Sequence, residues 1–341
     1  MKCRKLLLLG LLVVLCLTVQ AQVRKSGSIF TEPASPQISR PSAESIHLPP
    51  TLATVTRELT YCKAGATALR MDAYIPTKQS ARPFPALIYI HGGAWITGDK
   101  DEGPIEADLP ELLARGYAVF SINYRLGPFN QFPSQIQDCK CAVRSLRANA
   151  MRYNIDATRI GVWGSSAGAH LAALLGTTNG ISDFEGYSGY PEASSAVQAV
   201  ATYFGPADLT TSDWGFFDKL GFLVVFGTSK NWKKASPINY VTKNDAPFLV
   251  VAGDRDDKVD VRQSQWFYAR LQASGVQSEL LIVKNSDHEF APKGGALLPT
   301  RADVTKRLAD FFDKNIRLIA SASLSNQNSR SVTSRQFAIT R

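Results

Sequence analysis

Short apolar runs alternate with longer helical patterns through the middle of this 341-residue chain. The short runs hold five or six residues and are rich in β-branched and aromatic side chains, which is typical of strands that are buried on both faces. They are Ala86–Ile90, Tyr117–Ile122, Arg159–Trp163, Ala199–Phe204, Phe248–Ala252 and Glu279–Val283. Strands of this kind occur mainly in parallel sheets, so the pattern predicts one.

Segments with helical periodicity separate these strands. They are Ile105–Arg115, Pro133–Tyr153, Ala167–Leu175, Val261–Ser274 and Thr300–Ile319. In the second, apolar residues recur at positions 136, 139, 143, 146 and 150, and this spacing places them on one helix face. The alternation of strand and helix predicts an α/β fold with a mostly parallel central sheet and helices on both faces.

Two stretches depart from this rhythm. Glu58–Ile75 is less regular, and we expect antiparallel strands at the sheet edge there. Asp208–Asn239 has aromatic residues without a clear period, and we expect a modest lid-like insertion over the sheet. We therefore predict one α/β domain over residues 51–320, between a flexible leader (22–50) and a flexible tail (321–341), both rich in small polar residues.

Residues 1–21 have the three-part pattern of a secretory signal peptide: a basic start, an apolar run from Leu6 to Val19 and a small residue, Ala21, at the expected cleavage site. The apolar stretch is shorter than the ~20 residues that span a bilayer, so we expect no stable membrane span. We expect a secreted or periplasmic protein. A lipid anchor on Cys16 is the alternative, but Leu15 stands where a small residue is required.

The formal net charge of +9 lies mostly in the two ends of the chain. Residues 1–21 contribute three positive charges, residues 22–50 one and residues 321–341 three, which leaves +2 for residues 51–320. A domain that binds nucleic acid carries a basic surface, and this one has no such excess. We therefore expect no nucleic-acid partner.

Three cysteines remain after removal of the signal peptide: Cys62, Cys139 and Cys141. The number is odd, so in an oxidising compartment at least one thiol stays free or pairs between chains. Cys139 and Cys141 are two apart on an expected helix and point in different directions, so we expect buried structural cysteines there. The four histidines show no metal-binding spacing, and we expect no metal and no cofactor.

The segment Gly164-Ser165-Ser166-Ala167-Gly168 directly follows a predicted strand and opens a helical stretch. A sharp strand-to-helix turn leaves little room for side chains, and glycines two positions before and after Ser166 supply that room. The turn exposes the Ser166 hydroxyl above the sheet beside the N–H groups of a helix N-terminus. This context favours a nucleophilic serine over a Gly/Ser-rich loop.

A second loop, His91-Gly92-Gly93-Ala94-Trp95, comes immediately after the first of these buried strands. Its two glycines let the backbone aim N–H donors at a developing oxyanion, with the N–H of Ala167 as their partner. The alternative for this segment alone is an ordinary tight turn.

Later in the chain, His288 follows the last predicted strand and is the expected general base by position and by elimination. Four aspartates, at positions 254, 256, 257 and 260, compete for the acid that orients it. The order serine, aspartate, histidine is that of α/β-hydrolases.

With these residues in place, the chain resembles α/β-hydrolase fold serine esterases of the hormone-sensitive-lipase-like group, and most closely the bifunctional feruloyl and acetyl xylan esterase-like branch. The resembling segments are MDAYIP from Met71, HGGAW from His91, GDK from Gly98, SINYR from Ser121, FP from Phe132, GVWGSSAGAHLAALLG from Gly161, FGPADL from Phe204, SP from Ser236 and the aspartate and histidine loops.

The family pattern Gly-x-x-Asp-x-x-Val fits Gly253, Asp256 and Val259, so the resemblance selects Asp256 as the acid. It also implies Gly92, Gly93 and Ala167 as oxyanion-hole donors, and we expect Trp95 to bind substrate. Glu289 departs from the small residue that relatives often carry after the histidine, and a carboxylate there affects substrate choice and pH optimum.

The resemblance implies an esterase for short-chain or aryl esters. Together with the expected export, it makes acetyl or feruloyl groups on plant polysaccharide the leading substrates. Two alternatives stay open. An arylformamidase-type amide hydrolase shares the HGG-x-W loop, and a non-catalytic binding protein can use a hydrolase scaffold. An intact serine, histidine and aspartate argue against the binding protein.

Overall fold

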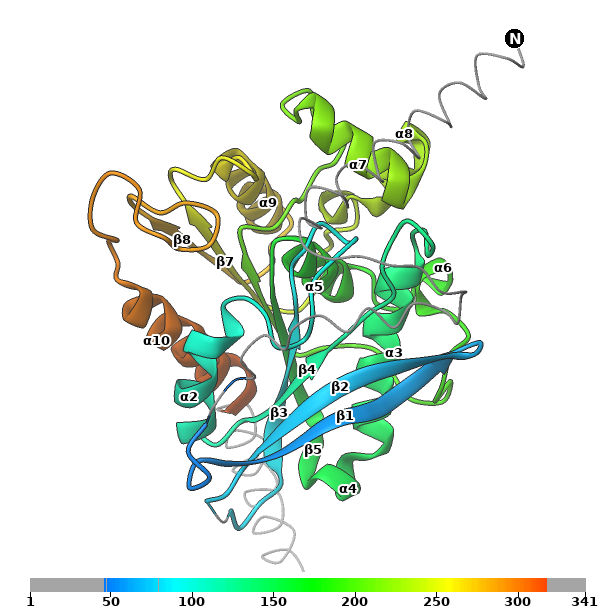
Figure 1. Cartoon of the computed structure of the whole chain (residues 1–341), viewed down its shortest axis with the longest axis vertical. Helices are drawn as coiled ribbons and strands as arrows, with labels where there is room; N and C mark the ends of the chain where they lie inside the picture. The colour runs from blue at the N-terminus through cyan, green and yellow to red at the C-terminus, as the bar shows by residue number, and fades with distance from the viewer. Residues whose placement is uncertain (1–45, 47, 79, 318–341) are drawn as a thin grey trace, which may run out of the picture. The chain divides into compact units, whose positions relative to one another are not determined.

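The computed structural model describes residues 46, 48–78 and 80–317. Its strands are β1 (Ala53–Ala64), β2 (Thr67–Pro76), β3 (Phe84–Ile90), β4 (Ala118–Ile122), β5 (Ile155–Ser165), β6 (Ala199–Tyr203), β7 (Phe248–Gly253) and β8 (Ser278–Val283). They form one sheet in the order β1-β2-β4-β3-β5-β6-β7-β8 (Figure 1). β1 and β2 are antiparallel to their neighbours, and the pairs from β4 through β8 are parallel. The predicted sheet and its antiparallel edge are confirmed.

The helices are α2 (Ile105–Ala114), α3 (Ser134–Ala148), α4 (Ala150–Tyr153), α5 (Ala167–Thr177), α6 (Ser182–Glu185), α7 (Phe216–Phe226), α8 (Ser229–Ala235), α9 (Val261–Ala273) and α10 (Arg301–Phe312), with short segments η1 (Pro237–Asn239) and η2 (Asp313–Arg317). The predicted helix over 133–153 is two helices, since α3 ends at Ala148 and α4 begins at Ala150. The region 208–239, which has no clear period, contains α7 and α8.

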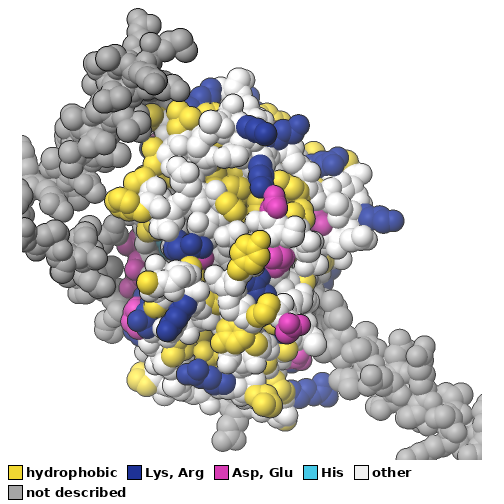
Figure 2. All heavy atoms as spheres, turned by 90° about the vertical axis from the view of Figure 1, so that its right-hand side faces the viewer, with side chains coloured by type: hydrophobic (Ala, Val, Ile, Leu, Met, Phe, Trp, Pro, Cys, Tyr) yellow, Lys and Arg dark blue, Asp and Glu magenta, His cyan; other side chains and the backbone are white. Residues whose placement is uncertain are grey.

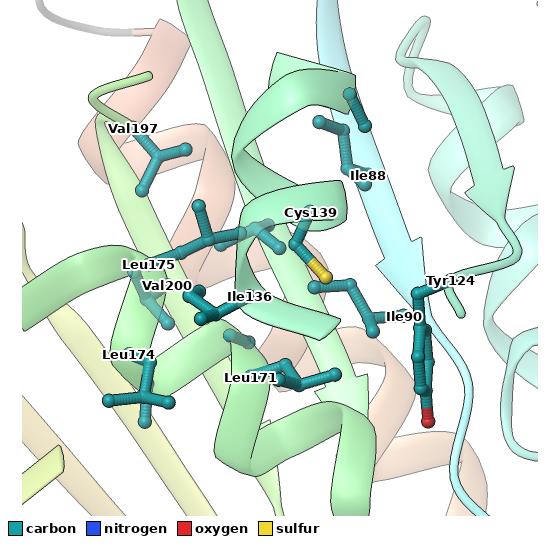
Figure 3. Close-up of a cluster of buried hydrophobic side chains, with 14 of the residues drawn as sticks. Ile88, Ile90, Tyr124, Ile136, Cys139, Leu171, Leu174, Leu175, Val197 and Val200 are labelled. Atoms are coloured by element: carbon teal, nitrogen blue, oxygen red, sulfur yellow. The ribbon is translucent and has the colours of Figure 1, made fainter. Parts of the chain in front are cut away.

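Successive residues of a strand point to opposite sides of the sheet, and every residue of β3 is buried. Helices therefore cover both faces of the sheet. In β3, Ile88 and Ile90 contribute to one core, with side chains of α3, α5 and α9. Leu87 and Tyr89 contribute to the other, with side chains of α2 and α10. Figure 3 shows the first core, in which α3 and α5 pack through apolar side chains against the sheet.

The cysteines differ in part from expectation. Cys62 on β1 and Cys141 on α3 form a disulfide, so Cys141 is bonded rather than a free buried thiol. The helix turns Cys141 toward the edge strand and Cys139 toward the core, because residues two apart lie on different faces. Cys139 is free and fully buried, with its sulfur among the apolar side chains of Figure 3.

The ordered domain begins before the predicted boundary at residue 51. Ile46, within the predicted leader, is buried, and its carbonyl accepts a hydrogen bond of 3.1 Å from Arg57. An apolar residue that reaches the core is held there by burial, whatever the composition around it. The predicted signal peptide, the rest of the leader up to residue 45 and the tail from 321 lie outside the described residues.

In the part of the chain that the structure describes, no helix has the length and apolar character needed to cross a membrane. Lys and Arg side chains are interspersed with Asp and Glu and with apolar groups on the face shown in Figure 2. That face carries no continuous basic surface of the kind that tracks phosphates.

Candidate active site

Ser166 stands at the turn between β5 and α5 with φ 53° and ψ −119°, a conformation that residues other than glycine rarely adopt. The two flanking glycines permit it. A Cβ on Gly164 would lie 2.5 Å from the backbone of Gly168, and a Cβ on Gly168 would overlap the carbonyl of Ile90. The Ser166 N–H donates to the carbonyl of Tyr203 on the neighbouring strand at 2.9 Å, which fixes the turn.

Three side chains from distant parts of the chain meet at this turn. The Oγ of Ser166 lies 2.9 Å from Nε2 of His288, which follows β8. Nδ1 of the same ring lies 2.8 Å from a carboxylate oxygen of Asp256, which follows β7. We call Ser166, Asp256 and His288 the triad. All three stand at the carboxyl ends of parallel strands, where a doubly covered sheet places its ligand sites.

The hydrogen bonds define the proton positions. An ionised carboxylate only accepts, so Nδ1 of His288 carries the hydrogen and donates it to Asp256. Nε2 is then an acceptor for the Ser166 hydroxyl. This is the arrangement in which a histidine can remove the proton of a serine as that serine attacks.

Asp256 is held by its own loop. Its side chain is fully buried, and its second oxygen accepts from the backbone N–H groups of Lys258 and Val259, each at 2.9 Å. Gly253 lets this loop approach the histidine loop, because a Cβ there would overlap the carbonyl of Ser286. A buried carboxylate with three donors is fixed as an acceptor for His288.

The other three aspartates of this loop have different surroundings. Asp254 is exposed. Asp257 is exposed and pairs with Lys293 at 3.1 Å, and Asp260 caps α9 by accepting from the N–H of Arg262. The structure therefore brings only Asp256, of these four, to His288.

One aromatic ring packs against the histidine and a second packs behind it, and neither residue is marked as a site residue by the sequence patterns. The ring centroid of Phe204, just after β6, lies 4.6 Å from that of His288, and Phe290 lies 5.1 Å from Phe204. Both have positive φ, 45° and 62°, a conformation that residues other than glycine rarely adopt. The sequence offered a weak signal for both, because Phe204 directly follows β6 and Phe290 is two residues after His288. An aromatic residue in such a position is common, so this signal did not single them out.

The loop His91–Trp95, which we call the oxyanion loop, lies against the nucleophile. A Cβ on Gly92 would be only 3.4 Å from Cβ of Ser166, and Gly93 has φ 105°. Ala167 is the first residue of α5, where a backbone N–H has no acceptor within the helix. Of the three residues predicted to supply oxyanion donors, Gly92 therefore lies against Ser166 in space, Gly93 follows Gly92 in the loop, and Ala167 follows Ser166 in the chain.

We predicted that Trp95 binds substrate, but its surroundings do not fit that role. Only 5% of it is exposed, and its indole N–H donates to Nδ1 of His170 at 3.1 Å. Phe222 and Phe226 of α7 pack against its ring. The indole donor is already used inside the protein, so Trp95 belongs to the support of the loop. Glu289 is exposed to solvent, next to the site.

No group of three or more His, Cys, Asp or Glu side chains that could hold a metal ion is found among the described residues. The chemistry that the triad supports is nucleophilic attack by a serine, assisted by a histidine.

Comparison with known proteins identifies relatives. Residues 71–271 match the family model described as BD-FAE. Esterase LipC of Mycobacterium tuberculosis is 36% identical over 237 residues, in an alignment that covers 66% of this chain and 58% of LipC. This chain therefore spans less than two thirds of the length of that curated relative.

Solved structures agree with this relationship. A truncated carbohydrate esterase from gut microbiota is 30% identical with a TM-score of 0.67, over 78% of this chain and 98% of that one. A bifunctional GH43-CE protein of Bacteroides eggerthii is 31% identical with a TM-score of 0.66, over 76% of this chain and 38% of that one. The fold is the predicted α/β-hydrolase fold.

Proposed function

Because this chain belongs to the BD-FAE family, we propose that it is a serine carboxylesterase that works through an acyl-enzyme on Ser166. The observation that carries the proposal is the continuous hydrogen-bond chain from Ser166 through His288 to Asp256. Its relatives include proteins named as esterases. Family membership supports the reaction class, and the geometry supports the part that we assign to each residue.

In this mechanism Oγ of Ser166 attacks the ester carbonyl carbon while its proton moves to Nε2 of His288. Asp256 holds the ring and stabilises the imidazolium that forms. The tetrahedral intermediate collapses when His288 returns the proton to the leaving alcohol, which breaks the C–O bond. Water then attacks the acyl carbonyl, gives its proton to His288, and releases the acid as the proton returns to Ser166.

The oxyanion of each tetrahedral intermediate needs donors on the side opposite the histidine. We assign this role to the backbone N–H groups of Gly92, Gly93 and Ala167. Backbone donors held by a folded loop need no reorganisation as charge develops, and one such donor contributes about 10²–10³ in rate.

For the substrate, we propose short-chain or aryl esters, with acetyl or feruloyl groups on plant polysaccharide as the leading candidates. The support is the similarity to a carbohydrate esterase and to a bifunctional GH43-CE protein. A solvent-facing histidine side chain, 15% exposed, is compatible with an ester that projects from a larger molecule.

We also propose that the protein is exported to the periplasm or the medium with its mature N-terminus at Gln22. The disulfide between Cys62 and Cys141 supports this, because such bonds persist in oxidising compartments. Intact-mass analysis of exported protein should give a chain that begins at Gln22. Thiol titration in denaturant should find one free thiol, Cys139, and three after reduction. A retained Met1 or a lipid on Cys16 would overturn the proposal.

The test of activity uses the chain from Gln22 to Arg341 and its Ser166→Ala variant. Both are assayed on p-nitrophenyl acetate, longer p-nitrophenyl esters, methyl ferulate, acetylated xylan and an arylformamide. Turnover of short esters that disappears in the variant supports the esterase, and the ferulate and xylan assays then assign the substrate. Faster turnover of the arylformamide than of the matching aryl ester would favour the amide hydrolase. No turnover of any compound by the wild type would favour the binding protein.

A further inference from the structure

The oxyanion loop has an unusual backbone. Gly93, Ala94 and Trp95 have consecutive positive φ values of 105°, 51° and 61°. Residues other than glycine hold such conformations only where their surroundings impose them. Two of the expected oxyanion donors, the N–H groups of Gly92 and Gly93, belong to this loop, so whatever imposes its conformation also sets their positions.

The side chain of Trp95 is the anchor of this loop. Its indole N–H donates to Nδ1 of His170 at 3.1 Å, a bond between two buried side chains, and the two rings meet edge to face. The ring of Phe226 on α7 also packs edge-on against it, with centroids 4.9 Å apart. The backbone carbonyl of Trp95 accepts from Gly127 at 2.9 Å. Trp95 is therefore held at both its ring and its backbone.

His170 can accept this bond in only one tautomer. Its Nε2 lies 2.7 Å from the carbonyl oxygen of Ala235, and a carbonyl only accepts, so Nε2 carries the hydrogen and Nδ1 is left as an acceptor. Complete burial lowers the pKa of His170 to about 4, so the ring is neutral at physiological pH. A protonated ring would lose the acceptor that Trp95 needs.

His170 also belongs to the helix that carries the nucleophile. It lies in the first turns of α5, and its backbone N–H donates to the carbonyl of Ser166 at 3.0 Å. The hydrogen bonds thus run from the oxyanion loop, through Trp95, to the helix that begins beside Ser166, and on to the end of α8 at Ala235. The loop and the nucleophile are tied to the same side chain.

We propose that His170 is a positioning residue of the oxyanion hole, which acts through Trp95 to hold the donors of the oxyanion loop against Ser166. His170 has no part in proton transfer. The inference rests on the proposed esterase function and adds to it a second histidine with a different task. Because a misplacement of ~1 Å can cost about 100-fold in rate, loss of this anchor should lower turnover rather than ground-state binding.

The experiment compares two disruptive variants with one conservative variant and one matched control. Trp95→Phe removes the indole donor and leaves a smaller aromatic ring, and His170→Leu removes both ring nitrogens at similar volume. His170→Gln keeps a donor and an acceptor. Trp214→Phe is the control: Trp214 is 7% exposed, donates to the carbonyl of Asp208 and packs on Phe222, which in turn contacts the Trp95 ring. The same change of residue type is thus made one contact away from Trp95, with the bond between Trp95 and His170 left intact.

We expect Trp95→Phe and His170→Leu each to lower kcat on p-nitrophenyl acetate by roughly 10- to 100-fold with KM within about threefold. His170→Gln should recover most of the loss, and Trp214→Phe should keep the wild-type kcat. A trifluoromethyl ketone, which forms a tetrahedral adduct, should lose affinity in parallel with kcat. In the double variant Trp95→Phe/His170→Leu the losses should not multiply, because both remove one bond.

A measurement independent of activity separates the failure of this inference from that of the esterase function. Labelling with ¹⁵N-tryptophan gives one indole signal for each of the five tryptophans, and Trp95→Phe identifies its own. This signal should shift in His170→Leu, which has no acceptor for the indole, and stay in place in Trp214→Phe. A shift in His170→Leu with unchanged kcat, or losses that multiply in the double variant, would overturn the positioning role. An inactive wild type would overturn both proposals, and an unmoved signal would overturn the hydrogen bond itself.

Discussion

The two halves of the site are built in different ways. The triad joins side chains from three loops through two hydrogen bonds, and Ser166 and His288 are 122 positions apart in the sequence. The oxyanion loop uses backbone groups, and buried aromatic side chains hold it in a left-handed conformation. The triad thus depends on the identity of a few side chains, whereas the oxyanion loop depends on backbone shape and on the residues beneath it.

Two of the histidines near the site, His288 and His170, show the same difference. Each is hydrogen-bonded through both ring nitrogens. His288 lies between a carboxylate that accepts from Nδ1 and a hydroxyl that donates to Nε2, and its side chain is 15% exposed. His170 lies between an indole N–H and a carbonyl in a fully buried position, where protonation costs a hydrogen bond as well as desolvation. Surroundings, rather than residue type, decide which one can act as a base.

The most severe break is at the nucleophile. Ser166→Ala removes the attacking oxygen and leaves both histidines in place, so we expect kcat on p-nitrophenyl acetate to fall by about 10⁶. The unfolding temperature should change little, because the alanine retains Cβ. A stopped-flow assay measures the rate of the wild type, and a long steady-state assay measures the rate of Ser166→Ala. A loss of less than tenfold would mean that another group attacks the ester.

The second break is at the acid of the triad. Asp256→Asn leaves the shape but presents an amide to Nδ1 of His288, which favours the wrong tautomer, so kcat should fall by about 10⁴. Asp254→Asn and Asp257→Asn are matched controls in the same loop and should retain nearly full kcat. Equal losses in all three variants would show that the charge of the loop matters rather than the contact with His288.

The third change tests the backbone half. Gly93→Ala adds a Cβ that overlaps the carbonyl of Thr97 at φ 105°, so the oxyanion loop must move and kcat should fall by about 10²–10³. Gly275→Ala is the matched control, since φ is 78° but no atom lies within 4 Å of the new Cβ. That variant should lose about 1 kcal/mol of stability and no kcat. Full activity in Gly93→Ala would contradict the assignment of the loop.

The smallest expected effect is on the pH dependence of stability, and it tests whether His170 is neutral in the folded protein. Burial lowers the pKa of His170 to about 4, against 6.5 for an ordinary histidine. Below pH 6.5 the unfolded chain therefore binds a proton that the folded chain does not, so the stability contribution of this neutral histidine is complete above pH 6.5 and is lost as pH falls toward 4.

The variant His170→Leu has no ring to bind this proton in the unfolded chain. Between pH 6.5 and 4 its unfolding free energy should fall by about 3 kcal/mol less than that of the wild type, as measured by urea unfolding at several pH values. If the unfolding free energy of the two proteins changed equally with pH, His170 would take up its proton in the folded state as it does in the unfolded state. That result would also remove the acceptor for Trp95.

The sequence predicts the sheet and the positions of the triad well, for a physical reason. Buried parallel strands need continuous apolar runs, and a sharp turn at Ser166 needs glycines at 164 and 168, so both leave local marks. The choice of Asp256 among four aspartates came from the family pattern, because a charged loop has no periodicity that singles out one carboxylate.

The remaining features depend on contacts between distant residues. Trp95 was predicted to bind substrate, but its indole donates to His170, which is 75 residues away in the sequence. Cys62 pairs with Cys141 across 79 residues, and only the fold brings β1 to α3. The break of the predicted helix at Asn149 has no strong helix-breaking residue such as glycine or proline. Such features follow from packing that a local pattern does not contain.

The most direct test of the central claim is to trap the acyl-enzyme. The chain from Gln22 is mixed with p-nitrophenyl acetate, quenched in acid within the first turnover, and analysed by intact mass and peptide mapping, with Asp256→Asn and Ser166→Ala alongside. The account predicts one acetyl group per chain, on Ser166, and none in Ser166→Ala. Release of p-nitrophenol with no acetylated chain, or with acetyl on another residue, would contradict it.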